Sequence, residues 1–84
     1  MMTTVKVLGA GCTKCKLLHQ RLLALKTDNG FDFDLVKVTD LNEIISYGIM
    51  ATPGLIINGV VKSVGTVPED AQLLQWLKEQ RNAS

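Results

Sequence analysis

Two cysteines separated by two residues are the part of this sequence best suited to chemistry. The motif reads Cys12-Thr13-Lys14-Cys15. A disulfide at this spacing closes too small a loop to stabilise a fold appreciably, and two cysteines are too few for the disulfide framework of a small secreted protein. Paired thiols can instead cycle between dithiol and disulfide, or hold a soft metal such as copper(I) or zinc. The motif therefore indicates thiol chemistry of one of these kinds.

The segments on either side of the motif predict a strand before it and a helix after it. Residues 5–8 are rich in β-branched side chains and run into the turn Gly9-Ala10-Gly11. A helix is predicted from Thr13 to Lys26, where apolar residues recur at steps of four and three: Leu18, Leu22 and Leu25. Cys15 lies on the same stripe. The turn residues 27–30 are predicted to end the helix, because Gly30 can adopt the left-handed conformation of a helix terminus. A pair of cysteines between a strand and a helix indicates redox activity rather than two small buried hydrophobic residues.

The start of this helix favours a thiolate at the first cysteine. Cys12 faces backbone N–H groups that have no partner within the helix, together with the positive end of the helix dipole. Lys14 and Lys16 add positive charge nearby. We therefore predict that Cys12 is the nucleophile that attacks a substrate disulfide. Cys15, one turn deeper and on the apolar stripe, would then resolve the mixed disulfide.

The rest of the chain predicts three more strands, two of them joined as a hairpin, and two more helices. Alternating residues from Phe31 to Val38 indicate a second strand, and Asp40 caps a short helix that stops at Gly48. Asn58-Gly59 joins two apolar strands as a type I′ hairpin. A capping-box spacing from Thr66 to Glu69, with a proline in the first turn, starts the last helix. The order βαβαββα predicts an α/β fold with a four-stranded mixed sheet and helices on both faces.

Length and composition narrow the class of protein. With 84 residues, the chain predicts one domain spanning 1–84. A net charge of +1 gives no basic field, so nucleic acid is not expected as a partner. The longest apolar runs are far shorter than the roughly 20 residues that span a bilayer, and the N-terminal residues do not resemble a secretory signal. We expect a cytoplasmic protein without a membrane anchor.

Several motifs in order resemble the small, glutaredoxin-sized members of the thioredoxin superfamily. They are the cysteine pair, the stretch from Tyr47 to Pro53, the Asn58-Gly59 hairpin and the segment from Gly65 to Leu77. The resemblance implies a monomeric thiol–disulfide oxidoreductase without a cofactor, which exchanges electrons with protein disulfides and an upstream reductase. It also implies a cis Thr52–Pro53 bond beside the disulfide. We expect substrate to contact these two residues and the three around the cysteines: Gly11, Thr13 and Lys14.

Two features of the sequence differ from thioredoxins. Gly11 stands where thioredoxins usually have tryptophan, and Lys6 stands where they supply a buried carboxylate that helps to deprotonate the resolving thiol. Cys15 would therefore need another base or water. Two other functions remain open at this point: a soft-metal carrier using the same thiolates, with His19 as a further ligand, and a scaffold that only docks partners.

Overall fold

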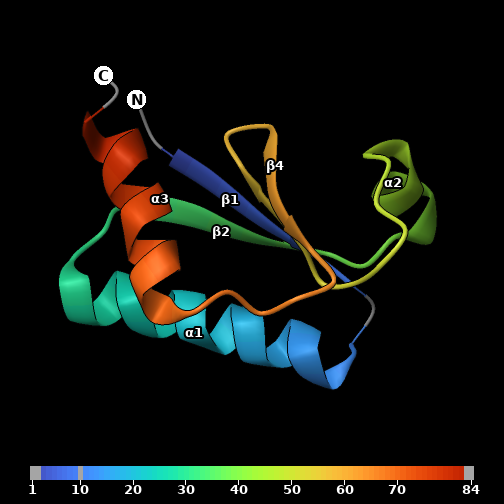
Figure 1. Ribbon diagram of the computed structural model, residues 1–84, viewed down its shortest axis with the longest axis horizontal. Helices are drawn as coiled ribbons and strands as arrows, with labels where there is room; N and C mark the ends of the chain where they lie inside the picture. Colours follow the sequence, from blue (N-terminus) through green and yellow to red (C-terminus); the bar gives the residue numbers. More distant parts are fainter. Residues whose placement is uncertain (1–2, 10, 83–84) are drawn as a thin grey trace.

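The computed structural model describes residues 3–9 and 11–82, which form the predicted βαβαββα order. Ala10, in the predicted turn before the cysteines, lies outside the described residues. Figure 1 shows the path of the chain, which passes through these elements: β1 (Thr3–Leu8), α1 (Thr13–Asn29), β2 (Phe33–Val38), α2 (Leu41–Ser46), β3 (Gly54–Ile57), β4 (Val60–Val64) and α3 (Asp70–Asn82).

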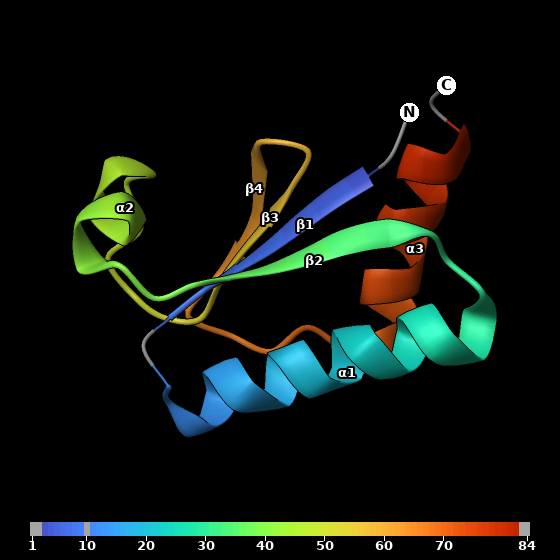
Figure 2. The same cartoon turned by 180° about the vertical axis from the view of Figure 1, so that it is seen from behind.

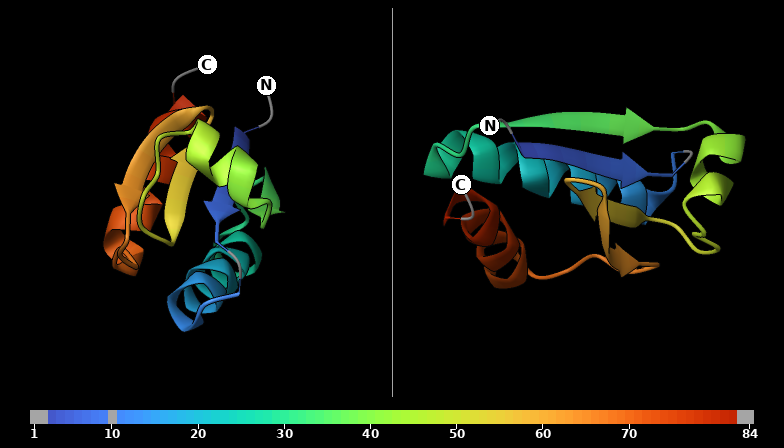
Figure 3. Two further views of the ribbon diagram at one scale, coloured as in Figure 1. Left: turned by 90° about the vertical axis from the view of Figure 1, so that its right-hand side faces the viewer. Right: turned by 90° about the horizontal axis from the view of Figure 1, so that it is seen from above.

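The four strands form one mixed sheet in the order β2-β1-β3-β4. β1 pairs in parallel with β2, while β3 is antiparallel to both β1 and β4. The helices lie on both faces, as predicted: α1 and α3 cover one face and α2 the other (Figures 2 and 3). Because β1 and β2 are parallel, their C-terminal ends lie at the same end of the sheet. The start of α1, which follows β1, and the start of α2, which follows β2, therefore lie at that end (Figure 1).

Alternate residues of β1 serve two separate cores. Val5 and Val7 pack into the larger core, which includes the predicted stripe of α1 and the buried leucines of α3. Leu8 packs on the opposite face with Ile44 of α2 and Ile49 of the following loop. This alternation follows from the two-residue period of a strand. The two cores hold β1 between them, and the redox motif follows β1 directly.

The hairpin forms at the predicted dipeptide. Asn58 and Gly59 have φ of 50° and 82°, as the two central positions of a type I′ turn require. The Asn58 side chain also accepts a hydrogen bond from the Thr4 N–H at 2.9 Å and donates one to Gln80 at 2.7 Å. The turn thereby ties the hairpin to β1 and α3.

Three predicted boundaries were wrong. Helix α1 runs to Asn29, three residues past the predicted Lys26, although Gly30 terminates it with a left-handed φ of 65°, as predicted. β2 begins at Phe33, which pairs with Thr3 at the start of β1, while Phe31 precedes the strand and is buried in the core. α3 begins at Asp70, not within the Thr66–Glu69 segment. The Glu69 carbonyl accepts the N–H groups of Gln72 and Leu73, both at 3.0 Å, so Glu69 caps the helix.

Candidate functional site

The two cysteines are joined by a disulfide and differ in exposure. Cys12 is the N-cap of α1, with extended backbone angles, and is partly exposed. Cys15 lies in the first turn and is only 1% exposed. Their Cα atoms are 5.1 Å apart. The Cys12 sulfur is therefore the one that an approaching molecule reaches first.

The backbone at the start of α1 directs hydrogen-bond donors at Cys12. The Cys15 N–H donates to Cys12 Sγ at 3.1 Å, and the Lys16 N–H donates to the Cys12 carbonyl at 3.0 Å. A donor aimed at a sulfur stabilises that sulfur as a thiolate, and the helix dipole acts in the same direction. Lys14 and Lys16 are exposed, and the first turn contains no acidic residue. The local field around Cys12 is therefore positive.

The loop between α2 and β3 brings Thr52 to the disulfide from 40 residues away. The Thr52–Pro53 peptide bond is cis, and Pro53 is buried. The Thr52 hydroxyl is 4.0 Å from Cys12 Sγ, a long O–H···S contact. The Gly65 N–H donates to the Pro53 carbonyl at 2.8 Å, which joins this loop to the end of β4. The two segments that the sequence resemblance associates thus lie together.

Gly9 is a further residue of the site that the sequence did not single out. It is buried, and its N–H donates to the Val38 carbonyl at 2.9 Å, so its backbone is held against β2. A Cβ at this position would overlap Cys15 Sγ and lie 3.5 Å from Thr52 Cβ. Glycine is therefore required for the disulfide to pack against the strand end. The available signal was the small-residue run before Cys12, which we interpreted only as a turn.

Of the other predicted contact residues, Gly11 and Thr13 are exposed beside Cys12. Gly11 has φ of 78°, and a Cβ there would meet no atom within 4 Å. The space next to the accessible sulfur is therefore open on this side.

Lys6 points to the face of α2 and contacts Tyr47. Its Nζ donates to the Tyr47 hydroxyl at 2.8 Å and lies 5.5 Å from the centre of the ring. This hydrogen bond, the charge of Tyr47 and that of Glu43 raise the pKa of Lys6, so the ammonium form is favoured. Among the residues with described side chains, none of the buried ones is charged or polar. A buried carboxylate next to Cys15 is thus absent from the described site.

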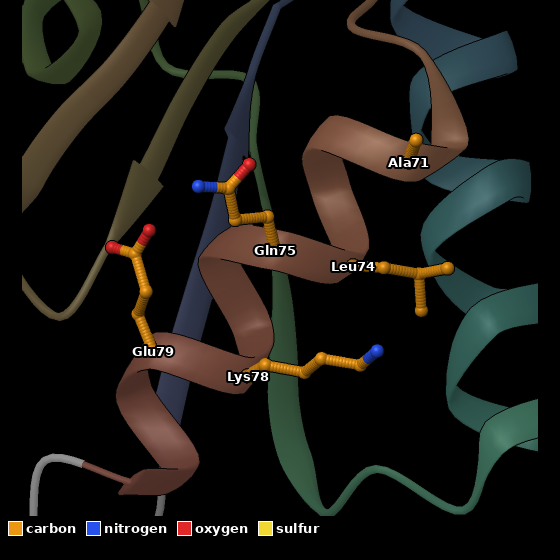
Figure 4. A pocket seen from close by; sticks show the side chains of 5 residues that line it. All are labelled: Ala71, Leu74, Gln75, Lys78 and Glu79. Carbon is orange, nitrogen blue, oxygen red and sulfur yellow. The ribbon is translucent and has the colours of Figure 1, made fainter.

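Two other kinds of site find no support in the described residues. No three His, Cys, Asp or Glu side chains among them come together to hold a metal ion, and no described helix has the length and hydropathy to cross a bilayer. A hollow lies along α3, far along the chain from the cysteines. Figure 4 shows the side chains that line it: Ala71, Leu74, Gln75, Lys78 and Glu79.

Comparison with known proteins gives consistent matches over nearly the whole chain. A family model described as a thioredoxin domain matches residues 3–78. A thioredoxin of Methanocaldococcus jannaschii is 31% identical over 78 residues, which cover 93% of this chain and 90% of the relative. A thioredoxin of Methanothermobacter thermautotrophicus is 26% identical over 76 residues, covering 90% of this chain and 99% of the relative.

Proposed function

Because this chain belongs to the thioredoxin domain family and is a thiol–disulfide oxidoreductase, we propose that it reduces disulfides of partner proteins and is itself restored to the dithiol by a reductase. The chain would act as a single domain and a monomer in the cytoplasm. The metal-binding alternative has no support in the matches or in the described residues.

The difference in exposure between the two sulfurs supports their separate roles. In the dithiol form, Cys12 loses its proton and its thiolate attacks one sulfur of the partner disulfide. The partner's second sulfur leaves as a thiolate, and a mixed disulfide with Cys12 remains. Cys15 then loses its proton and attacks Cys12 Sγ. This step forms the Cys12–Cys15 disulfide and releases the attacked sulfur of the partner as a second thiolate. The two partner thiolates take up two protons from water, matching the two lost by Cys12 and Cys15, so that two electrons have moved to the partner.

The proton of Cys15 needs an acceptor. Lys6, at the position where thioredoxins supply a carboxylate, is a protonated donor to Tyr47. No buried carboxylate is present among the described side chains. Water entering beside Cys12 is therefore the acceptor in this proposal, and it reaches Cys15 once the disulfide has opened.

The contact surface for the partner surrounds Cys12. Thr52, whose hydroxyl contacts the sulfur, offers main-chain groups to which an extended substrate segment can pair. Pro53 lies next to it, and its carbonyl accepts the Gly65 N–H, which holds this backbone in place. Gly11, Thr13 and Lys14 border the same sulfur from the α1 side and are exposed. These residues surround the Cys12 sulfur and leave it accessible to the partner.

Trapping the mixed disulfide tests this assignment. Cys15→Ser retains the nucleophile but lacks the resolving thiol, so a reduced sample should accumulate a covalent adduct with a disulfide-containing protein such as insulin. Cys12→Ser is the matched control and should give no adduct. A stable adduct through Cys15 in the Cys12→Ser variant, with none in Cys15→Ser, would reverse the roles. Failure of both variants and of the intact dithiol to react would remove the proposed activity.

A further inference from the structure

Met50 is displayed to solvent more fully than any other large apolar side chain among the described residues. It is 98% exposed, and the next such residue, Leu41, is 68% exposed. Water contact with a side chain of this kind is unfavourable, and covering it with apolar atoms is favourable. Met50 therefore has apolar surface that a second molecule could cover.

The backbone on either side of Met50 is firmly held. Ile49 is 4% exposed and packs in the core under α2, and Pro53 is buried at the start of β3. Ala51 lies against Gly65, where an added Cβ would be 3.1 Å from Ala51 Cβ. The exposed residues 50–52 thus span the short distance between two buried anchors, and the position of Met50 is set by them.

Met50 is two residues before Thr52, which contacts the reactive sulfur. Two residues of extended chain span at most about 7 Å, so the Met50 Cα lies within that distance of the Thr52 Cα. The Thr52 hydroxyl is 4.0 Å from Cys12 Sγ. A partner must bring its own sulfur into contact with Cys12. If its chain runs in extended form along residues 50–52, each residue advances about 3.3 Å, and residues two or three positions from its cysteine reach Met50.

We infer that Met50 is a specificity-determining residue that contacts an apolar side chain two or three residues from the reactive cysteine of the partner. The inference rests on the proposed function and deepens it by naming the substrate class: protein disulfides flanked by apolar residues. An unbranched thioether adapts its shape to different partners. It therefore suits a surface that accepts several apolar side chains, provided that the partner presents one at this distance.

The test uses two synthetic peptides, each with one intramolecular disulfide, which differ only in having leucine or serine at the second and third positions from the reactive cysteine. The reduced protein should reduce the leucine peptide with a kcat/KM about fivefold higher. Met50→Gln should remove this preference, and Met50→Leu should keep it. Because Met50 is exposed, both variants should fold normally and react with a small aromatic disulfide at the intact protein's rate.

Oxidation of Met50 to its sulfoxide provides a second test, because it makes the side chain polar without a substitution. Hydrogen peroxide applied to the disulfide form transfers one oxygen to the Met50 thioether, giving the sulfoxide, and is itself reduced to water. After reduction of the disulfide with dithiothreitol, the sulfoxide form should have lost the preference. Peroxide-treated Met50→Leu controls for oxidation at other methionines.

An equal rate for both peptides with the intact protein, or an unchanged preference in Met50→Gln, would overturn the inference while the disulfide reductase activity stands. Reduction of neither peptide and of no protein disulfide would instead remove the proposed function.

Discussion

Gly9→Ala should make the Cys12–Cys15 disulfide easier to reduce. The new Cβ would overlap Cys15 Sγ and lie 3.2 Å from Cys15 Cβ, and the backbone cannot easily retreat because the Gly9 N–H is bonded to Val38. In the disulfide, Cys15 Sγ is fixed by its bond to Cys12. In the dithiol, the same sulfur can turn to another rotamer. The crowding therefore falls mainly on the oxidised form.

The size of the effect follows from the cost of overpacking a core, about 1–3 kcal/mol. If this cost is confined to the disulfide form, the reduction potential rises by roughly 20–60 mV, since about 30 mV corresponds to 1.4 kcal/mol for two electrons. Equilibration in graded thiol–disulfide buffers measures the shift, and denaturant unfolding of both forms locates the destabilisation.

Gly30→Ala is the matched control for this experiment. Gly30 has φ of 65°, ends α1 and has open space where a Cβ would be. The substitution should destabilise both forms equally, by about 1–2 kcal/mol, and leave the potential unchanged. The reasoning fails if Gly9→Ala also lowers the stability of both forms equally without moving the potential, because Cys15 Sγ would then not be confined by Gly9.

Two further predictions concern residues next to the loop that carries Thr52: Tyr47 before it and Gly65, which contacts it. Tyr47→Phe removes the acceptor of the Lys6 hydrogen bond and should lower the pKa of Lys6, measured by NMR titration of its side chain; a Lys6 titration that stays in place would show that Tyr47 does not perturb it. Since folding raises this pKa, the interaction stabilises the protein below the unfolded value of about 10.4 and is lost as the pH rises through the folded value. Gly65→Ala forces an alanine to φ of 76° and towards Ala51, and should lower the free energy of unfolding by about 1–2 kcal/mol; a smaller loss in denaturant unfolding would mean that the loop next to Ala51 yields.

The parts of the fold that could be predicted depend on local patterns. The stripe of α1 identified its buried face because side chains three and four apart share one side of a helix. Asn58-Gly59 identified its turn because few dipeptides adopt two positive φ angles easily. The start of α3 was mispredicted from an equally local signal. A capping-box spacing is present at Thr66, but the first N–H groups of α3 are bound by the Glu69 carbonyl. Val67, which the spacing placed in the first turn of the helix, precedes the helix and packs against the core.

The parts of the site that could not be predicted depend on contacts between distant segments. The cysteines and their order of exposure followed from a motif and a helical period. Lys6 and Tyr47 are 41 residues apart, and no pattern in either segment indicates their hydrogen bond. The approach of Gly9 to Cys15 likewise requires the position of α1 relative to β1. Only the resemblance to thioredoxins placed Thr52 near Cys12.

The most direct test of the central claim is a redox titration of the intact chain. The protein is equilibrated at graded potentials, free thiols are labelled with a mass tag, and tags are counted by intact mass. We predict one two-electron transition, in which both tags are lost together without dimer formation, at a midpoint within roughly −270 to −120 mV. Thiols that never pair, or that pair only between molecules, would contradict the assignment of Cys12 and Cys15 as a reversible redox couple.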